Sequence, residues 1–387
     1  MCGYLAVAIC FRELTVIRKT LLVLHRWVAL VVGLFVFFVS LTGAALVFEN
    51  QIDRALNSSL FHVRPQGERL PLQPLLERVR STYPEARVTS VRLAEAAGLS
   101  HQFQLSNRVT VYVEPYTGRI LGTRSMAQWE VGLARRLHLL HTRLMAGQVG
   151  EWIVGVISFL TAFLVVTGLI LWWPACILTL RRRGSWKRWN SDAHYALGFY
   201  TAPIAMVMAV TGVIIAFGDF ADPLIDRLNA APPPARPTRV APTSNGRPIG
   251  PDEAAQIAQK ALPGAVLALL TLPEGLRPIV AQMKYPEDRT PTGRSRVFLN
   301  PHSGEVLLVE NTRQAGFGTQ LHNLKRSLHT GDIFGWPTRI LYFIASLVLA
   351  LLWVTGMLMW WPAFRFRRKN RTSQRTTVQE TIEAHAP

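Results

Sequence analysis

Cysteine is scarce in this chain, which has 387 residues and only three cysteines, Cys2, Cys10 and Cys176. None of them lies in the two longest polar segments, residues 49–148 and 218–335, so a disulfide framework is excluded there. The sequence also has no CxxC pair and no Cys/His spacing of the kind that binds zinc. A GxGxxG motif between a strand and a helix is missing as well, which argues against a nucleotide-binding domain.

Charged residues are nearly absent from four long apolar stretches. These are Val28–Phe48, Val149–Trp173, Tyr195–Phe217 and Ile340–Trp361. A helix needs roughly 20 apolar residues to cross the ~30 Å hydrocarbon core of a bilayer, and each stretch meets this length. The first stretch is too long for a signal peptide and is not followed by a clear small-residue cleavage site. We therefore expect four retained transmembrane helices rather than buried helices of a soluble protein.

The chain has a net charge of +18, and much of this charge lies beside the ends of the apolar stretches. The basic residues there are Arg12, Arg18, Lys19, Arg181, Arg182, Arg183, Lys187, Arg188, Arg365, Arg367, Arg368, Lys369, Arg371 and Arg375. Basic residues that flank transmembrane helices favour the cytoplasmic side. The charge is therefore interpreted as a sign of topology and not of nucleic-acid binding.

Hydropathy and charge together divide the chain into nine parts. They are a cytoplasmic N-terminus (1–20), a first membrane helix (21–48), an external segment (49–148), a second helix (149–174), a cytoplasmic basic loop (175–191), a third helix (192–218), a second external segment (219–335), a fourth helix (336–362) and a cytoplasmic basic tail (363–387).

The two external segments repeat one order of elements. Each begins with an amphipathic pattern that predicts a helix, at Leu70–Tyr83 in the first segment and at Pro251–Leu262 in the second. Runs with alternating apolar residues then predict strands. The strands are Arg87–Leu93, His101–Leu105, Val109–Glu114 and Arg119–Gly122 in the first segment, and Ala265–Leu272, Arg277–Tyr285 and Arg294–Leu299 in the second. The Pro-rich stretch Pro223–Arg247 is expected to be a linker.

Short motifs also recur between the two halves. Residues 113–118 (VEPYTG) match residues 299–304 (LNPHSG), and Pro174 and Pro362 each lie 33 residues after a histidine of a Leu-His-Thr motif. Each repeat is then a helix, an external α+β module and a second helix. The sequence therefore predicts an integral membrane α-helical protein with a duplicated two-helix repeat, whose halves are related by a pseudo-two-fold axis along the membrane normal.

Six of the ten histidines lie at the ends of the expected membrane helices. Four others are expected on the surface or in loops, namely His62, His101, His302 and His385. Of the six, His25 and His194 lie on the cytoplasmic side. The other four lie on the external side and are His138, His141, His322 and His329. Residues three or seven apart share a helix face, so each external pair is expected to point in one direction.

A single histidine at a membrane edge is explained by hydrogen bonds at the headgroup level, but sets matched by a repeat indicate a shared ligand. Imidazole is the usual nitrogen ligand of haem iron. A bare metal ion fits less well, because the apolar stretches contain only one carboxylate, Glu151. The sequence has no CxxCH motif, so a haem would be bound without covalent attachment.

The histidines thus predict two haems of the b type. One is expected between His25 and His194 near the cytoplasmic face. The other is expected between His141 and His329 near the external face. His138 and His322 are alternative ligands for this outer haem, and the sequence leaves the choice open.

Small residues punctuate the apolar stretches. Each stretch contains a Thr-Gly pair, at Thr42-Gly43, Thr167-Gly168, Thr211-Gly212 and Thr355-Gly356. Such residues let membrane helices approach closely. Gly33, Gly43, Gly198 and Gly212 are also expected to leave room for a flat cofactor.

These motifs together resemble the PepSY-associated transmembrane family. The resemblance rests on His25-Arg26-Trp27, on the two Leu-His-Thr motifs, on the Trp-Trp-Pro helix ends and on the two Pro-x-x-Gly turns of the external modules, and it covers roughly residues 15–370. Within this family the chain is similar to ferric-siderophore reductases of the Gram-negative inner membrane. The resemblance implies two periplasmic PepSY-like modules, haem b, and electron transfer to periplasmic ferric-siderophore with release of Fe(II).

Two other functions are compatible with the membrane topology. A siderophore or peptide permease would need intramembrane carboxylates to couple ions, and the four apolar stretches contain only one, Glu151 at the external end of the second stretch. A regulatory membrane protein whose PepSY-like modules bind a partner would leave the matched histidines unexplained. The cytoplasmic segments are too short for a flavin domain, so the expected electron donor of a reductase is a quinol or a partner protein, and the other expected contacts are membrane lipid and ferric-siderophore.

Overall fold

The computed structural model describes residues 2–125, 129–180, 185–232, 234–240, 247–290 and 292–384, without the side chains of 2–15, 129–134 and 362–384. These residues form two compact units. One comprises residues 1–45, 140–216 and 340–387 and is called the membrane unit below. The other comprises residues 46–139 and 217–339 and is called the sheet unit.

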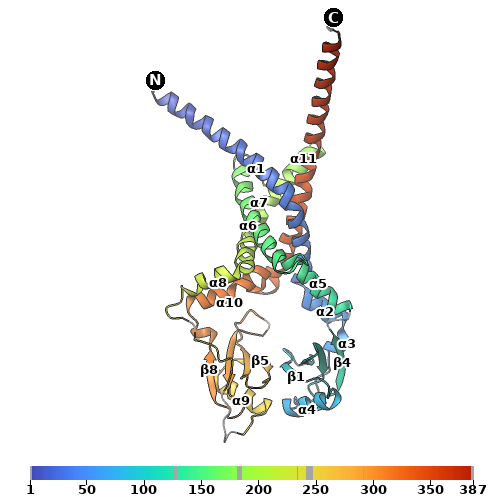
Figure 1. The fold of residues 1–387 in the computed structure, drawn as a ribbon, viewed down its shortest axis with the longest axis vertical. Helices are drawn as coiled ribbons and strands as arrows, with labels where there is room; N and C mark the ends of the chain where they lie inside the picture. Colours follow the sequence, from blue (N-terminus) through green and yellow to red (C-terminus); the bar gives the residue numbers. More distant parts are fainter. Residues whose placement is uncertain are drawn as a thin grey trace. The chain divides into compact units, whose positions relative to one another are not determined.

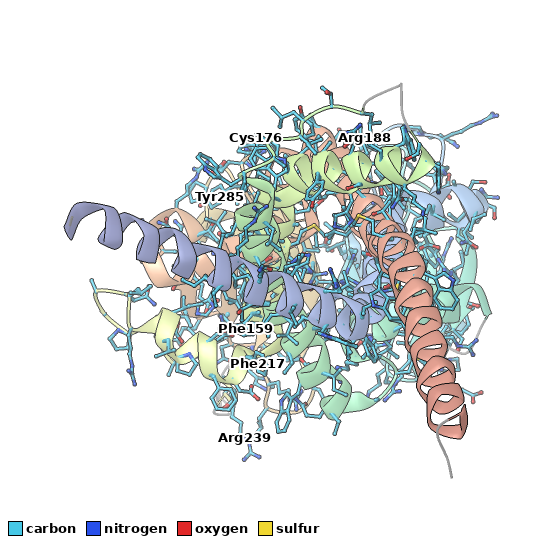
Figure 2. All side chains as sticks on the ribbon, turned by 90° about the horizontal axis from the view of Figure 1, so that it is seen from above. Phe159, Cys176, Arg188, Phe217, Arg239 and Tyr285 are labelled. Carbon is cyan, nitrogen blue, oxygen red and sulfur yellow. The ribbon has the colours of Figure 1, made fainter. Side chains whose placement is uncertain are left out.

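The membrane unit contains four helices that are long and apolar enough to cross a bilayer, as predicted. Their membrane-spanning parts are Val16–Val47 in α1 (Cys2–Val47), all of α6 (Gly147–Trp172) and α7 (Trp186–Ala216), and Trp336–Trp361 in α11 (Trp336–Ala384). Helices α1 and α11 continue beyond the apolar stretches into the basic terminal segments (Figure 1). The connection between α6 and α7 carries Cys176, which is exposed (Figure 2).

The sheet unit is built from short helices and eight strands. Its first part contains α2 (Glu49–Leu56), α3 (Ser58–Phe61), α4 (Leu72–Thr82), β1 (Val88–Arg92), β2 (His101–Leu105), β3 (Val109–Val113), β4 (Ile120–Ser125) and most of α5 (Trp129–Arg143). Its second part contains α8 (Gly218–Asp226), α9 (Pro251–Ala261), β5 (Val266–Thr271), β6 (Ile279–Lys284), β7 (Ser295–Leu299), β8 (Val306–Glu310) and α10 (Phe317–Thr330), with the 3-10 turns Thr312–Gln314 and Asp332–Phe334.

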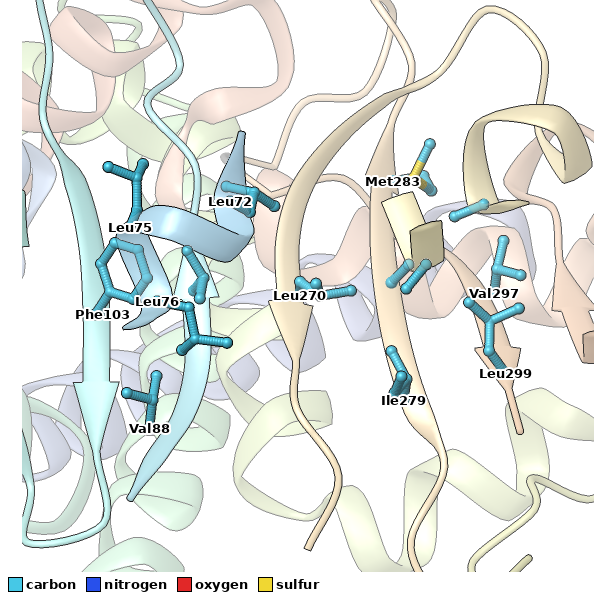
Figure 3. Packing of buried hydrophobic residues seen from close by; sticks show 14 of the residues in the cluster. Leu72, Leu75, Leu76, Val88, Phe103, Leu270, Ile279, Met283, Val297 and Leu299 are labelled. Carbon is cyan, nitrogen blue, oxygen red and sulfur yellow. The ribbon is translucent and has the colours of Figure 1, made fainter. Parts of the chain in front are cut away.

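The strands form a single antiparallel sheet in the order β4-β3-β2-β1-β5-β6-β7-β8. The two parts join where β1 pairs with β5, with Val91 opposite Leu270. The sequence predicted the two helix-and-strand segments but neither this junction nor strand β8. One apolar core extends across the junction and includes Leu75, Phe103 and Met283 (Figure 3).

Helix α4 receives its N-terminal cap from the other half of the sheet unit. The residue before α4 is Pro71, which supplies no side-chain cap. Instead, the two carboxylate oxygens of Asp252 in α9 accept hydrogen bonds from Leu72 N at 2.6 Å and Gln73 N at 2.8 Å. This carboxylate satisfies two of the backbone N–H groups that a helix start leaves unpaired.

The two parts of the sheet unit have a turn and a β-bulge at corresponding positions. The turn after β3 is closed by a hydrogen bond from Gly118 N to Glu114 O at 3.0 Å, and the turn after β7 by one from Gly304 N to Asn300 O at 2.9 Å. Both glycines have a positive φ, of 71° and 73°, which favours glycine at these positions. Bulges also occur at corresponding places, after Tyr112 in β3 and after Phe298 in β7.

His101 was expected on the surface, and this prediction is wrong. It lies in β2 with a relative exposure of 2%. Its Nδ1 accepts a hydrogen bond from Ala94 N at 2.8 Å, so the ring is neutral at that nitrogen. Burial, assisted by the charge of Arg69, lowers the pKa of His101 to about 4. Of the other three, His62 is exposed, His302 is half-buried in a turn, and His385 lies outside the described residues.

Candidate cofactor-binding site

His25 in α1 is held by a threonine of the next membrane helix. Its Nδ1 lies 2.8 Å from the hydroxyl of Thr167 in α6, which is 2% exposed. The Thr167 hydroxyl donates its own hydrogen to Phe163 O at 2.8 Å, so it must accept one from His25. The hydrogen of the neutral His25 ring therefore lies on Nδ1, which leaves the lone pair of Nε2 for a ligand.

His194 in α7 is held in the same way by α11. Its Nδ1 lies 2.8 Å from the hydroxyl of Thr355, which donates to Leu351 O and Leu352 O, each at 3.0 Å. The Nε2 of His194 is therefore also the unprotonated nitrogen. Asn190, one turn earlier in α7, donates to Thr355 O at 2.9 Å and fixes the two helices against each other.

His141, at the end of α5, is held by α1. Its Nδ1 donates to the carbonyl of Val39 at 2.9 Å and lies 3.3 Å from the hydroxyl of Thr42. A carbonyl oxygen only accepts, so Nδ1 carries the hydrogen here too, and Nε2 is left unprotonated. A Cβ on Gly43 would come within 2.9 Å of the His141 ring, so this position has no room for a side chain.

The Thr-Gly pairs thus have a role that the sequence did not reveal. They were predicted to let helices pack closely and, at Gly43 and Gly212, to leave room for a cofactor, but three of the four hold a histidine ring against their helix. A Cβ on Gly168 or Gly356 would lie 3.5 Å from the ring that the neighbouring threonine binds. The hydroxyl of Thr211 in the fourth pair donates to Val207 O at 2.6 Å, as the other three threonines donate within their own helices. Recurrence of the pair in every apolar stretch was the available signal.

His322 has a different environment from the anchored histidines. Its Nε2 lies 3.0 Å from Asp226 and its Nδ1 lies 3.5 Å from Asp222, both in α8. Lys325 binds the same Asp222 carboxylate at 2.6 Å. Carboxylates thus lie near both ring nitrogens of His322, and Nε2 makes the shorter contact.

The remaining predicted ligands lie on the helices that carry His141 and His322. His138 lies on α5, three residues before His141, and His329 lies on α10, seven residues after His322. Both are half-buried.

These residues fit haem better than a bare metal ion. Among the described residues, no group of three or more His, Cys, Asp and Glu side chains is placed to hold a metal ion. Separate imidazoles with Nδ1 tied to a hydroxyl or carbonyl match the second-shell arrangement that orients a ligating histidine. The Nε1 of Trp353 in α11 is moreover buried and has no hydrogen-bond partner among the described residues.

Two of the glycines that were expected to leave room for a cofactor instead make room for protein side chains. Gly33 faces the indole of Trp353, and Gly43 faces the imidazole of His141. The space for a cofactor must therefore be set by other residues than these two.

Comparison with known proteins agrees with the motifs described above. The family model of the PepSY-associated TM region matches residues 22–362, which include the spanning parts of α6, α7 and α11, most of that of α1, and the whole sheet unit. No curated protein matches the sequence significantly. The chain therefore belongs to the PepSY-associated transmembrane family.

Proposed function

We propose that this protein is a di-haem oxidoreductase that carries electrons across the bacterial inner membrane to a periplasmic ferric-siderophore, so that the more weakly held Fe(II) is released for uptake. The observation that supports it best is the shared anchoring of His25, His194 and His141. Each ring is fixed through Nδ1, which carries the hydrogen, so Nε2 is the unprotonated nitrogen. This is the state in which imidazole binds iron.

The inner haem would be held by His25 and His194, and the outer haem by His141 and His329, with His138 as the other candidate in α5. When bound, haem b supplies a one-electron carrier whose iron alternates between Fe(III) and Fe(II). The protein's contribution is to fix the ligands. The hydrogen bond from Nδ1 to Thr167 or Thr355 holds the ring orientation and makes Nε2 more basic.

Duplication of a two-helix unit explains the arrangement economically. In this proposal the contact of His25 with Thr167 corresponds to that of His194 with Thr355, and both distances are 2.8 Å. The matching turns and bulges of the sheet unit support the same relation. A chain of two such repeats would have both termini in the cytoplasm and the sheet unit in the periplasm. Its electron donor would be a quinol or a partner protein.

A difference spectrum tests the proposal. The full-length protein purified in detergent is expected to show a b-type haem signal in the reduced-minus-oxidised spectrum, with two haems per chain. His25→Ala or His194→Ala is expected to remove one haem, and His141→Ala or His329→Ala the other. His62→Ala is the matched control, because His62 is exposed, and it should retain both.

The same spectrum separates this proposal from the alternatives. A permease, or a regulatory protein that acts through its PepSY-like modules, needs no haem. Purified protein without any b-type signal, even after expression with added haem, would contradict the reductase proposal. Reduction of ferric-siderophore by haem-loaded protein with a quinol as donor then tests the substrate class.

A further inference from the structure

An aromatic pair lies between the residues that hold the inner and outer histidines. These supporting residues are Thr355, which contacts His194, and Val39, which contacts His141. The ring of Trp353 in α11 lies 5.3 Å from that of Phe37 in α1, measured between centroids, with an interplanar angle of 50°. The indole also covers Gly33, where a Cβ would overlap its ring. Glycine at position 33 therefore lets the indole lie directly against α1.

The position of this pair along the helices is intermediate. Gly33 follows His25 by eight residues and precedes Thr42 by nine, which corresponds to about 12 Å and about 14 Å along α1 at the helical rise. Trp353 lies two residues before Thr355, which supports His194. Phe37 lies two residues before Val39, whose carbonyl supports His141. The two rings thus connect the neighbourhoods of the inner and outer supports.

The indole nitrogen gives a second, independent observation. Trp353 Nε1 is buried and has no hydrogen-bond partner among the described residues. A buried N–H without a partner destabilises the folded protein, and a leucine or phenylalanine at this position would avoid this cost. Stability alone therefore does not explain a tryptophan at position 353. Its position between Thr355 and Val39 offers another explanation.

We propose that Trp353 and Phe37 form the contact through which electrons pass from the inner to the outer haem. This inference rests on the proposed function. The haem held by His25 and His194 would supply one electron, and the haem held by His141 and His329 would accept it. The indole mediates the coupling and is itself neither oxidised nor reduced, because a neutral indole is far harder to oxidise than a b-type haem. Trp353 is a positioning residue in this scheme and not a ligand.

The test follows the two haems separately in the full-length, haem-loaded protein. Reconstituted protein with a quinol as donor should show two phases of haem reduction in a stopped-flow experiment at the haem absorption bands. Trp353→Leu is expected to slow the second phase several-fold, whereas Trp353→Phe, which keeps an aromatic ring, should retain most of the rate. Trp173→Leu is a suitable control, because Trp173 is 74% exposed at the end of α6.

Haem content decides how each result is interpreted. If Trp353→Leu keeps two haems and an unchanged second phase, the proposal is wrong. If that variant loses a haem, Phe37→Leu decides by the same measurement, since it removes the other ring of the pair. Wild-type protein without haem would contradict the proposed function itself, which is a distinguishable outcome.

A second inference concerns α8, whose two sides differ. One side carries Asp222 and Asp226, which bind Lys325 and His322 of the adjacent α10 (Figure 1). The other side presents three large apolar residues to solvent at a helical spacing of four. They are Phe220 and Leu224 in α8 and Leu228 in the turn that follows it, with exposures of 69%, 59% and 52%.

We infer that this apolar side of α8 lies in the headgroup layer of the bilayer. Helix α7, which is long enough to cross the membrane, ends at Ala216, and α8 begins at Gly218. A helix joined so closely to a membrane span stays at the bilayer surface, where an amphipathic helix buries its apolar side. Arg227 directly follows α8 and is exposed, and a side chain of this kind reaches the headgroups with its guanidinium while its stem contacts the acyl chains.

Spin labels test this placement without reference to haem. Cys2, Cys10 and Cys176 are replaced by serine, and a nitroxide is attached at Leu224→Cys in full-length protein in phospholipid vesicles. We expect greater accessibility to oxygen than to a water-soluble nickel complex. Val266→Cys, at a 62% exposed position of β5, is the control and should show the reverse. Nickel access at position 224 would contradict the inference, and protection from both quenchers would indicate a protein partner instead.

Discussion

Thr167 and Thr355 allow a test at the scale of a single hydrogen bond. Replacement of either by valine keeps the side-chain shape but removes the acceptor of the Nδ1 hydrogen of His25 or His194. Loss of such a second-shell partner typically weakens metal binding roughly 10–100-fold. We therefore expect Thr167→Val and Thr355→Val to release the inner haem more readily, measured as haem retained after dilution into apomyoglobin.

This prediction has two matched controls, one at Thr161 in the same helix and one at Thr167 itself. Thr161 in α6 donates to Ile157 O and has no described contact with a histidine, so Thr161→Val should retain haem as the wild type does. Thr167→Ser keeps the hydroxyl and should restore retention. Equal haem loss from Thr161→Val and Thr167→Val would show that the effect comes from general destabilisation.

His101 makes the stability of the sheet unit depend on pH. Burial lowers its pKa in the folded protein to about 4, against about 6.5 in the unfolded chain. The unfolded state therefore binds more protons between these values, so the contribution is complete above pH 6.5 and is lost as pH falls towards 4. The loss amounts to about 3 kcal/mol. Hydrogen exchange of the Ala94 amide should accelerate over this range beyond its intrinsic pH dependence.

His101→Gln provides the control for this pH effect. A glutamine oxygen can accept the hydrogen bond from Ala94 N, as His101 Nδ1 does at 2.8 Å, but it does not titrate. The variant should therefore show a weaker pH dependence of exchange at Ala94. An unchanged dependence would assign the effect to other groups.

At the scale of elements, local sequence patterns predicted most of the helices and strands but did not predict which strands pair across the two parts of the sheet. Length and lack of charge predicted the four membrane helices, and the amphipathic pattern predicted α4 and α9. The pairing of β1 with β5 joins residues about 180 positions apart, and an alternation pattern does not specify which strand lies beside which. Strand β8 was missed because it is an edge strand of four apolar residues in succession, partly exposed on both faces, with no alternation to detect.

The contribution of Asp252 to the stability of α4 can be tested by a single substitution. It caps α4 from α9 through two hydrogen bonds, so Asp252→Ala leaves Leu72 N and Gln73 N without these acceptors. Removal of a helix N-cap typically costs about 1 kcal/mol and up to about 2. We expect a lower thermal midpoint and faster hydrogen exchange in the first turn of α4. Glu253→Gln, which affects only an exposed pair with Arg247, should leave both nearly unchanged.

At the scale of the whole molecule, the sequence indicated candidate ligand histidines but not how their rings are held. Matched positions at helix ends selected His25, His194 and His141, and the structure adds the orientation of each ring. The contacts with Thr167, Thr355 and Val39 come from helices far away in the sequence, so spacing within one helix could not reveal them. For the same reason the carboxylates that enclose His322 were not anticipated.

The topology of the molecule yields a prediction that needs no cofactor. The loop between α6 and α7 is rich in arginine and should face the cytoplasm, because basic residues that flank membrane helices are retained on that side. Cys176 in this connection is exposed and reports its location. With Cys2 and Cys10 replaced by serine, a membrane-impermeant maleimide should label Cys176 in inside-out vesicles and not in spheroplasts. Val266→Cys in a chain that also carries Cys176→Ser should be labelled in spheroplasts only. Labelling of Cys176 in intact spheroplasts would indicate the opposite orientation. A cytoplasmic electron donor would then meet the sheet unit first and not the histidines of α1 and α7.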